Sequence, residues 1–344
     1  MKPLIAVAVS GGVDSLVAAA LLKVRGYPVF GIHFVTGYEP RNRDVAAVTD
    51  QLGIRLHVVD LADVFRTQVV TYFLRTYLAG KTPNPCMVCN PAIKFGALFE
   101  HARHLGAERL ATGHYARSVQ DTRQQPHLLR GADRQKDQSY FLAFLTRPQL
   151  AGACFPLGEM QKSEVKAWAA SEGLHPLARQ ESQDACFISD RRYTDFLTDQ
   201  LGTISSPGEI VDRGGRVLGR HAGLHRYTVG QRRGIDCPAA EPYYVLRLDT
   251  RSNRLVVGSR EDTRASHCRV QAINWIQPEP PGPIRVHTRV RYRHTAALST
   301  LTPQPQHQAV IRFDEPQSAI TPGQGAVFYL GEEVIGGGWI WGDL

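Results

Sequence analysis

Six consecutive residues near the start of the chain have the types and order of a phosphate-binding turn. Residues 10–15 read Ser-Gly-Gly-Val-Asp-Ser, between an apolar segment at 4–9 and an amphipathic segment at 16–24. Glycine lets the backbone approach an anion and adopt positive φ, and we expect Gly11 and Gly12 to use that freedom. The N–H groups and the dipole at the start of the following helix would then hold negative charge.

The acidic residue inside this turn requires an explanation, because a carboxylate alone would repel phosphate. We expect Asp14 to cap the helix or to face a bound Mg2+. Ser10 and Ser15 add hydroxyl donors. The turn lacks the Gly-Lys-Ser/Thr end of a Walker loop and the three glycines of the dinucleotide fingerprint. An ordinary strand-turn-helix is the alternative, but the full hexapeptide at the first strand-helix junction favours phosphate binding.

Cysteines are the second candidates for chemistry. Residues 82–90 read TPNPCMVCN, which we expect to be a loop with a CxxC pair, Cys86 and Cys89, and residues 181–188 place Cys186 among polar residues. No second CxxC or spaced His pair follows, so a complete zinc site is not expected. The three thiolates could hold a 4Fe-4S cluster with one iron open. Alternatively, one thiol carries a persulfide sulfur and another resolves the resulting bond. Both schemes need partly exposed thiols with lowered pKa values.

The composition of the chain limits the classes of protein to which it can belong. The 344 residues are 43% hydrophobic, which allows a large core and more than one domain. The formal net charge of +8 permits a nucleic-acid partner without proving one. No apolar run reaches the roughly 18 residues of a membrane span, and the N-terminus is a poor signal peptide. We therefore expect a cytoplasmic protein that does not bind a membrane.

The pattern of predicted secondary structure divides the chain into two parts. Strands expected at 29–34, 55–59 and 109–112 alternate with helices expected at 44–52, 64–78 and 95–105. That order predicts a doubly wound parallel α/β sheet, with ligands at the carboxyl ends of its strands. Near Thr203 the pattern changes to short strand-like runs, and from about Cys268 alternating runs broken by Pro and Gly predict a small antiparallel β-barrel. The expected domains are 1–202, 203–267 (a small central domain) and 268–344.

Further short segments follow along the chain in a definite order. They read ATGHYA at 111–116, KDQSYFL at 136–142, FPLG at 155–158, GLHRYTVGQRRG at 223–234, VRYR at 290–293, FDEP at 313–316, TPGQ at 321–324 and GGG at 336–338. The hexapeptide resembles the PP-loop of ATP pyrophosphatases, which cleave ATP to AMP and pyrophosphate. Together with TPNPCxxCN and ESQDACF, the whole series resembles the bacterial and mitochondrial tRNA-specific 2-thiouridylases over essentially the entire chain.

The resemblance implies an activity and a set of site residues. In that family, ATP adenylates the C2 oxygen of a wobble uridine, and a cysteine persulfide, loaded by a sulfur-donor protein, then delivers sulfur. Cys89 and Cys186 match the catalytic cysteines. The matches to ATP contacts are Ala8, Val9, Ser10, Gly11, Gly12, Val13, Asp14, Ser15, Phe34 and Gly113. The matches to tRNA contacts are His114, Lys136, Asp137, Gln138, Arg291, Tyr292 and Gln324.

The chain departs from the family pattern at two places. Cys86 stands where many members have an Asp that has been considered an acid/base group. The extra thiol keeps both the cluster scheme and the persulfide scheme open. Residues 33–39 replace a segment that is usually rich in Asp, so only Glu39 and Asp44 remain nearby to assist Mg2+.

Two rival functions remain at this point. One is another PP-loop ligase or thiolase; an amidotransferase-coupled synthetase would need an ammonia source, and no glutaminase-like Cys/His arrangement is evident. The other is a non-catalytic RNA-binding protein of the same fold, which would tolerate loss of Asp14, Ser15, Cys89 or Cys186. All four residues are present.

Overall fold

The computed structural model describes residues 2–39, 45–177, 185–188, 191–202, 206–238 and 241–342. The chain forms two compact units. The first comprises Met1–Val69, Cys86–Ser189 and Glu332–Ile335, and the second comprises Val70–Pro85, Asp190–Gly331 and Gly336–Leu344. None of the described helices combines the length and the apolar character that crossing a membrane requires.

The first unit is built on a parallel sheet of five strands in the order β3-β2-β1-β4-β7. The register pairs Ala8 with Ile32 and Val7 with Ala111, so the carboxyl ends of the central strands lie at one edge. This arrangement confirms the predicted α/β sheet. The strands are β1 (Ile5–Ala8), β2 (Val29–Val35), β3 (Leu56–Asp60), β4 (Arg109–Ala111) and β7 (Ala153–Cys154).

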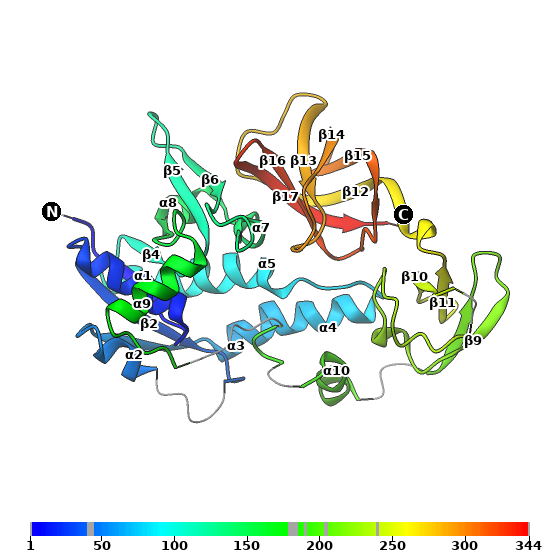
Figure 1. Ribbon diagram of the computed structural model, residues 1–344, viewed down its shortest axis with the longest axis horizontal. Helices are drawn as coiled ribbons and strands as arrows, with labels where there is room; N and C mark the ends of the chain where they lie inside the picture. Colours follow the sequence, from blue (N-terminus) through cyan, green and yellow to red (C-terminus); the bar gives the residue numbers. More distant parts are fainter. Residues whose placement is uncertain are drawn as a thin grey trace. The chain divides into compact units, whose positions relative to one another are not determined.

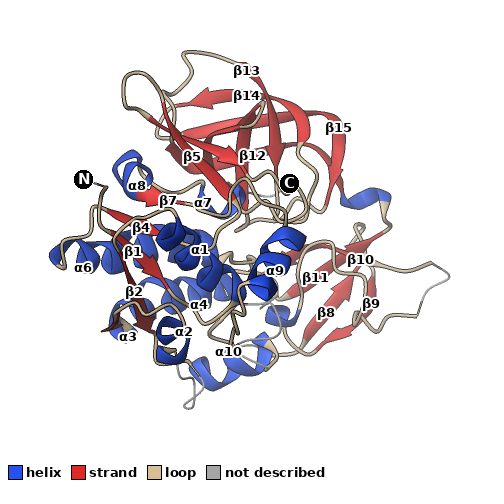
Figure 2. Ribbon diagram, turned by 60° about the vertical axis from the view of Figure 1, so that its left-hand side comes forward, coloured by secondary structure: helices blue, strands red, loops and turns tan. Residues whose placement is uncertain are grey.

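Helix α1 (Val13–Val24) fixes the turn that follows β1, because it is buried along most of its length. Leu16 and Leu22 pack with Ile5 and Val7 of β1 in one apolar cluster. In a second cluster, α1 packs against α9 (Lys162–Ser171). Figure 2 shows the sheet flanked by helices. The other helices of this unit include α2 (Ala46–Asp50), α3 (Ala62–Phe65), α6 (Phe99–His104), α7 (Ser139–Leu142) and α8 (Arg147–Gly152).

The CxxC pair lies in a helix, so the predicted loop is wrong. Helix α5 (Pro85–Cys89) continues into a π-helix, η2 (Asn90–Leu98), and then into α6. Proline is well suited to the first helical position, because the N–H that it lacks would have no partner there. The helix expected at 95–105 therefore begins at Pro85, and its regular geometry is broken at Gly96 (φ −99°, ψ −107°).

A π-helix also interrupts the helix predicted over 64–78. There, η1 (Arg66–Val70) lies between α3 and α4 (Thr71–Leu78).

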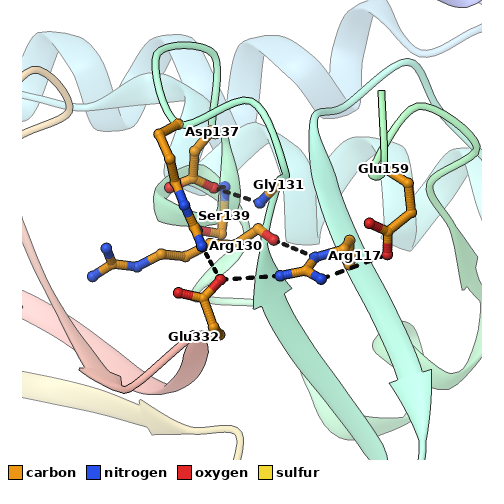
Figure 3. Close-up of polar contacts among 8 residues, drawn as sticks. Arg117, Arg130, Gly131, Asp137, Ser139, Glu159 and Glu332 are labelled. Carbon is orange, nitrogen blue, oxygen red and sulfur yellow. Dashed lines mark hydrogen bonds and ion pairs between the residues drawn. The ribbon is translucent and has the colours of Figure 1, made fainter. Parts of the chain in front are cut away.

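An antiparallel hairpin extends the first unit. Strand β5 (Ala116–Gln120) pairs with β6 (Pro126–Arg130), and β6 pairs with the first residues of β17 (Glu333–Trp341). Arg117 anchors the hairpin: its side chain donates to the carbonyl oxygen of Arg130 (2.6 Å) and to Glu332 (3.1 Å), as Figure 3 shows.

The second unit contains a four-stranded sheet and a barrel. The sheet has the order β10-β11-β8-β9 and a core that includes Ile210, Val245 and Leu255. Its strands are β8 (Gly208–Val211), β9 (Val217–His221), β10 (Tyr244–Asp249) and β11 (Arg254–Gly258). Helix α10 (Tyr193–Leu201) packs against α4 through Phe73 and Phe196.

The barrel confirms the predicted antiparallel architecture and is drawn in yellow, orange and red in Figure 1. Its strand order is β12-β15-β14-β13-β16-β17, and pairing between β12 and β17 closes it. The strands that precede β17 are β12 (Arg264–Trp275), β13 (Ile284–Arg289), β14 (Ala297–Gln304), β15 (Gln308–Ser318) and β16 (Gly325–Leu330).

Barrel closure requires glycine at position 338. A Cβ there would lie 2.5 Å from Cγ1 of Val270 and 2.9 Å from the carbonyl oxygen of Gln271, both in β12. We therefore expect Gly338→Ala to lower the free energy of unfolding by about 1–3 kcal/mol, measured by urea denaturation. Gly282→Ala is the control, since a Cβ there meets nothing within 4 Å. Equal stability of the two variants would contradict this packing.

Candidate functional site

The turn after β1 presents backbone amides at the start of α1. Gly11 has φ +82°, as predicted, whereas Gly12 has φ −83° and is the extended N-cap, so the expected positive φ at Gly12 is wrong. No side chain caps the helix. The Ser15 hydroxyl donates to the carbonyl oxygen of Gly12 (3.0 Å) and accepts the N–H of Ser10 (3.2 Å). These bonds hold the turn in shape while the first amides of the helix remain uncapped by any side chain, which is the geometry of an anion site.

Asp14 does not cap the helix, and this corrects one of its two predicted roles. Its carboxylate receives both charge and hydrogen bonds from residues distant in sequence. The ammonium of Lys162 lies 2.7 Å from each of its oxygens, and the Tyr115 hydroxyl donates to Oδ1 (2.8 Å). Lys162 is 7% exposed. The negative charge that would repel phosphate is therefore neutralised by a buried cation.

Gly113 and Phe34 lie at the strand ends that surround this turn. Gly113 follows β4, and a Cβ there would lie 2.8 Å from the backbone carbon of Asp14 and 2.9 Å from the nitrogen of Ser15. Only glycine allows that approach. Phe34 lies near the end of β2, one residue after His33, whose Nδ1 is 2.7 Å from the carbonyl oxygen of Val9. The structure thus gathers the ATP-contact candidates at one edge of the sheet.

The carboxylates proposed for Mg2+ are already engaged by protein groups. Both oxygens of Asp14 are paired with Lys162. Glu39 accepts hydrogen bonds from Thr36 and Gly37; burial alone would raise its pKa, but these bonds outweigh burial and lower the pKa. Asp44 lies outside the described residues. A magnesium ion here would rely on substrate phosphates and water rather than on a protein cage.

Three thiols of the first unit share one cation. Cys89 is buried, whereas Cys86 and Cys186 reach the surface, and none forms a disulfide. Although Cys86 and Cys186 are exposed as residues, the protein around the sulfur atoms desolvates all three thiols and raises their pKa, that of Cys89 to about 12. Lys94 acts in the opposite direction on each of them, and Cys186 is close enough to raise the pKa of the other two. The lowered pKa values that both chemical schemes require are therefore absent in the resting protein.

The segment of Cys186 is held by aromatic packing. The ring of Phe187 contacts those of Phe65 and Tyr38 edge-on, with centroids 5.7 and 6.0 Å apart. Residues 181–184 of the ESQDACF motif lie outside the described residues.

The thiols do not form a cluster site. Among the residues that the structure describes, which include Cys86, Cys89 and Cys186, no group of three or more His, Cys, Asp or Glu side chains is arranged to hold a metal ion.

Two of the four tRNA-contact candidates of the first unit, His114 and Asp137, are buried and hydrogen-bonded within the protein. His114 is buried, its Nδ1 is 2.7 Å from the Thr112 hydroxyl, and burial, aided by the charge of Lys94, lowers its pKa well below the ordinary value. Asp137 is also buried and accepts the N–H groups of Gly131 and Ser139 (Figure 3). Lys136 and Gln138, on either side of Asp137, are partly exposed.

The candidates in the second unit differ in exposure. Arg291 is exposed and Tyr292 half-buried, in the turn after β13. The Gln324 amide donates to the carbonyl oxygens of Thr82 (3.1 Å) and Pro83 (3.0 Å), so it anchors the segment that precedes the CxxC helix.

Sequence reasoning missed Lys162, Tyr115 and Lys94. Lys94 lies five residues after Cys89, a spacing that brings side chains together in a π-helix, but the sequence did not predict that geometry here. Lys162 and Tyr115 had no local signal, because their partner Asp14 is 148 and 101 residues away along the chain.

Lys94 should control thiol reactivity. Its charge favours the thiolate, so Lys94→Met should raise the thiol pKa further and slow alkylation of Cys186 by iodoacetamide at pH 8 by roughly three- to tenfold. Peptide mass spectrometry measures the rate at each cysteine. Lys166→Met removes an exposed lysine of α9 and should leave the rate unchanged. An unaltered rate in Lys94→Met would show that the lysine does not act on the thiols.

Three family models match the chain in succession. They are described as a tRNA methyl transferase HUP domain (residues 3–190), a tRNA methyl transferase PRC-barrel domain (194–259) and an aminomethyltransferase β-barrel domain (265–340). Among solved structures, a 4-thiouridine synthetase in complex with RNA and ATP is 17% identical, covering 59% of this chain and 51% of its own, at a TM-score of 0.34. A likeness this weak establishes nothing further.

Curated relatives match over nearly the full chain. A tRNA-specific 2-thiouridylase MnmA of Desulfosudis oleivorans is 52% identical, over 98% of this chain and 94% of the relative. Its counterpart in Syntrophotalea carbinolica is 47% identical, over 98% of each chain. That of Trichormus variabilis is 43% identical, over 97% of each. With this identity across the whole length, and with a HUP domain matched over residues 3–190, the chain belongs to the tRNA-specific 2-thiouridylase family.

Proposed function

We propose that the protein is a tRNA sulfurtransferase that replaces the C2 oxygen of a wobble uridine with sulfur at the expense of ATP. The observation that carries the proposal is the occurrence, in one compact unit, of a turn that leaves the first amides of α1 without a side-chain cap and of three thiols outside any disulfide, Cys86, Cys89 and Cys186. The first feature suits cleavage of a nucleotide, and the second suits sulfur transfer. The sequence identity to named 2-thiouridylases supports the same conclusion.

Activation of the base is assigned to the turn at residues 8–15, with Phe34 and Gly113 beside it. The C2 oxygen of uridine attacks the α-phosphorus of ATP, the bond to the β-phosphate oxygen breaks, and pyrophosphate leaves. The amides at the start of α1 and the ammonium of Lys162 would stabilise the charge on the departing phosphates. Adenylation turns a poor leaving group into a good one.

Sulfur transfer is assigned to Cys186 and Cys89. Cys186 is exposed, so a sulfur-donor protein can load it with a persulfide, whereas Cys89 is buried. The terminal persulfide sulfur attacks C2, the C2–O bond breaks and AMP leaves. The Cys89 thiolate then attacks Sγ of Cys186, forming a disulfide and leaving sulfur on the base. A dithiol reductant must restore the two thiols before the next cycle, which fits a reducing, cytoplasmic setting. Cys86 takes no part in this scheme.

Binding of the tRNA is assigned to residues of both units. In the first unit these are His114 and the Lys136, Asp137 and Gln138 loop. Burial holds His114 neutral, so it would contact RNA by stacking or hydrogen bonding rather than as a cation. In the second unit, Arg291 offers an exposed guanidinium and Tyr292 a ring, with Gln324 as the further candidate. Phosphate contacts by the basic chain should make binding sensitive to salt.

The cysteine roles can be separated by single substitutions. We expect Cys186→Ala and Cys89→Ala to abolish 2-thiouridine formation while retaining tRNA-dependent pyrophosphate release. Cys86→Ala should keep full activity without iron. The measurement is 2-thiouridine formed per enzyme under anaerobic conditions, with iron content and pyrophosphate release in parallel.

Three outcomes would contradict parts of this scheme. Loss of both activity and iron in Cys86→Ala would favour the cluster scheme. Robust thiolation by Cys186→Ala would refute the assigned site. Absence of tRNA-dependent pyrophosphate release in the unsubstituted protein would favour a non-catalytic RNA-binding protein, and release with a small-molecule acceptor in place of tRNA would favour another PP-loop ligase.

A further inference from the structure

Asp133 is a buried carboxylate that joins the Lys136–Gln138 loop to the nucleotide site. Oδ1 accepts the N–H groups of Gln135 (3.0 Å) and Lys136 (3.2 Å), and Oδ2 accepts the backbone N–H of Lys162 (2.9 Å). Asp133 is 7% exposed, so a donor that loses this partner is not readily rescued by water. The same Lys162 whose backbone is held here extends its ammonium to Asp14.

A second chain of hydrogen bonds runs from the same loop to the same carboxylate. The backbone N–H of Gln138 donates to the carbonyl oxygen of Tyr115 (2.8 Å), and its side-chain oxygen accepts the Tyr115 N–H (3.0 Å). The Tyr115 hydroxyl then donates to Asp14. Lys162, which neutralises Asp14, and Tyr115, which donates a hydrogen bond to it, are therefore both linked by hydrogen bonds to the loop expected to contact tRNA.

The loop between the attachments at Asp133 and Gln138 is held in place by further hydrogen bonds and close contacts. Asp137 accepts hydrogen bonds from Gly131 and Ser139 at 3.1 Å each, which closes the loop on itself (Figure 3). A Cβ at Gly131 would lie 2.7 Å from the carbonyl oxygen of Tyr115, so the loop lies directly against that backbone. A displacement of the loop must consequently move Tyr115 or Lys162, or break these bonds.

We propose that Asp133 is a positioning residue that couples tRNA binding at the Lys136–Gln138 loop to nucleotide binding at Asp14 and its turn. A tRNA bound at the loop adds to the bonds that hold it and so, through Asp133 and Gln138, further stabilises the start of α9, the ammonium of Lys162 and Tyr115 in the positions that the structure shows. The anion site is then set for phosphate, and ATP binds more tightly to the tRNA complex than to the protein alone. By thermodynamic reciprocity, ATP tightens tRNA binding by the same factor. The inference rests on the proposed function.

The test is a coupling ratio measured at equilibrium. The dissociation constant of a non-hydrolysable ATP analogue is measured by calorimetry with the full chain, alone and saturated with unmodified tRNA. We expect tRNA to tighten analogue binding by about fivefold or more in the unsubstituted protein. In Asp133→Asn the ratio should fall to near one. The asparagine NH2 group cannot accept a hydrogen bond, so either the N–H groups of the loop or the N–H of Lys162 loses its acceptor. Analogue affinity without tRNA should change by no more than about threefold, which separates lost coupling from general damage to the site.

Asp121→Asn is the matched control. Asp121 accepts the N–H groups of Arg123 and Gln125 (2.8 Å each) in the turn of the β5–β6 hairpin, but none of its hydrogen bonds reaches Lys162 or Tyr115. It should keep the full ratio, and its failure to do so would count against the proposal. Tyr115→Phe removes only the hydroxyl on Asp14 and should lower the ratio by about threefold or more. If Asp133→Asn does not fold, the ratio measured for Tyr115→Phe tests the coupling in its place.

Other outcomes would overturn the inference. A ratio near one in the unsubstituted protein, with both ligands bound, would refute the coupling and leave the proposed function standing. A full ratio in Asp133→Asn or in Tyr115→Phe would refute the role of the network. If the unsubstituted protein bound neither the analogue nor tRNA, the proposed function would fail together with the inference.

Discussion

The ion pair between Asp14 and Lys162 is the interaction on which the candidate site depends. A carboxylate in the first turn of α1 would repel phosphate, and no side chain on the turn itself offsets it. The compensating charge comes from α9, which is packed against α1 by an apolar cluster. The core of the first unit is thus a condition for the electrostatics of the site, because it brings a lysine from the start of α9 to the PP-loop.

The pKa values of the thiols also depend on two opposing effects, the charge of a lysine and burial, and burial is the stronger of the two. Lys94 favours the thiolate of Cys86, Cys89 and Cys186, but desolvation outweighs it and the pKa of each stays raised. The resting thiols are therefore protonated and weakly reactive near neutral pH. In the proposed cycle, loading Cys186 with sulfur supplies the reactivity that the resting thiols lack, since a persulfide is a strong nucleophile at neutral pH. Cys89 must then lose its proton before it attacks Cys186.

Local patterns in the sequence predicted the features that depend on neighbouring residues. The strand-turn-helix at residues 4–24, the parallel sheet and the antiparallel barrel follow from hydrophobic alternation and glycine placement. The CxxC helix was missed because Pro85 begins a helix there and η2 then continues it in an uncommon geometry. The partner of Asp14 could not be predicted, because Lys162 is 148 residues away and only the packing of α9 on α1 brings it close.

The most direct test of this account is a double-mutant cycle on that pair. The dissociation constant of a non-hydrolysable ATP analogue would be measured without added Mg2+ for the unsubstituted protein, Lys162→Met, Asp14→Asn and the double variant. The account predicts that Lys162→Met weakens binding by about tenfold or more, because the charge of Asp14 is left facing phosphate, and that adding Asp14→Asn recovers a large part of the loss. Analogue binding by Lys162→Met that equals that of the unsubstituted protein would contradict it.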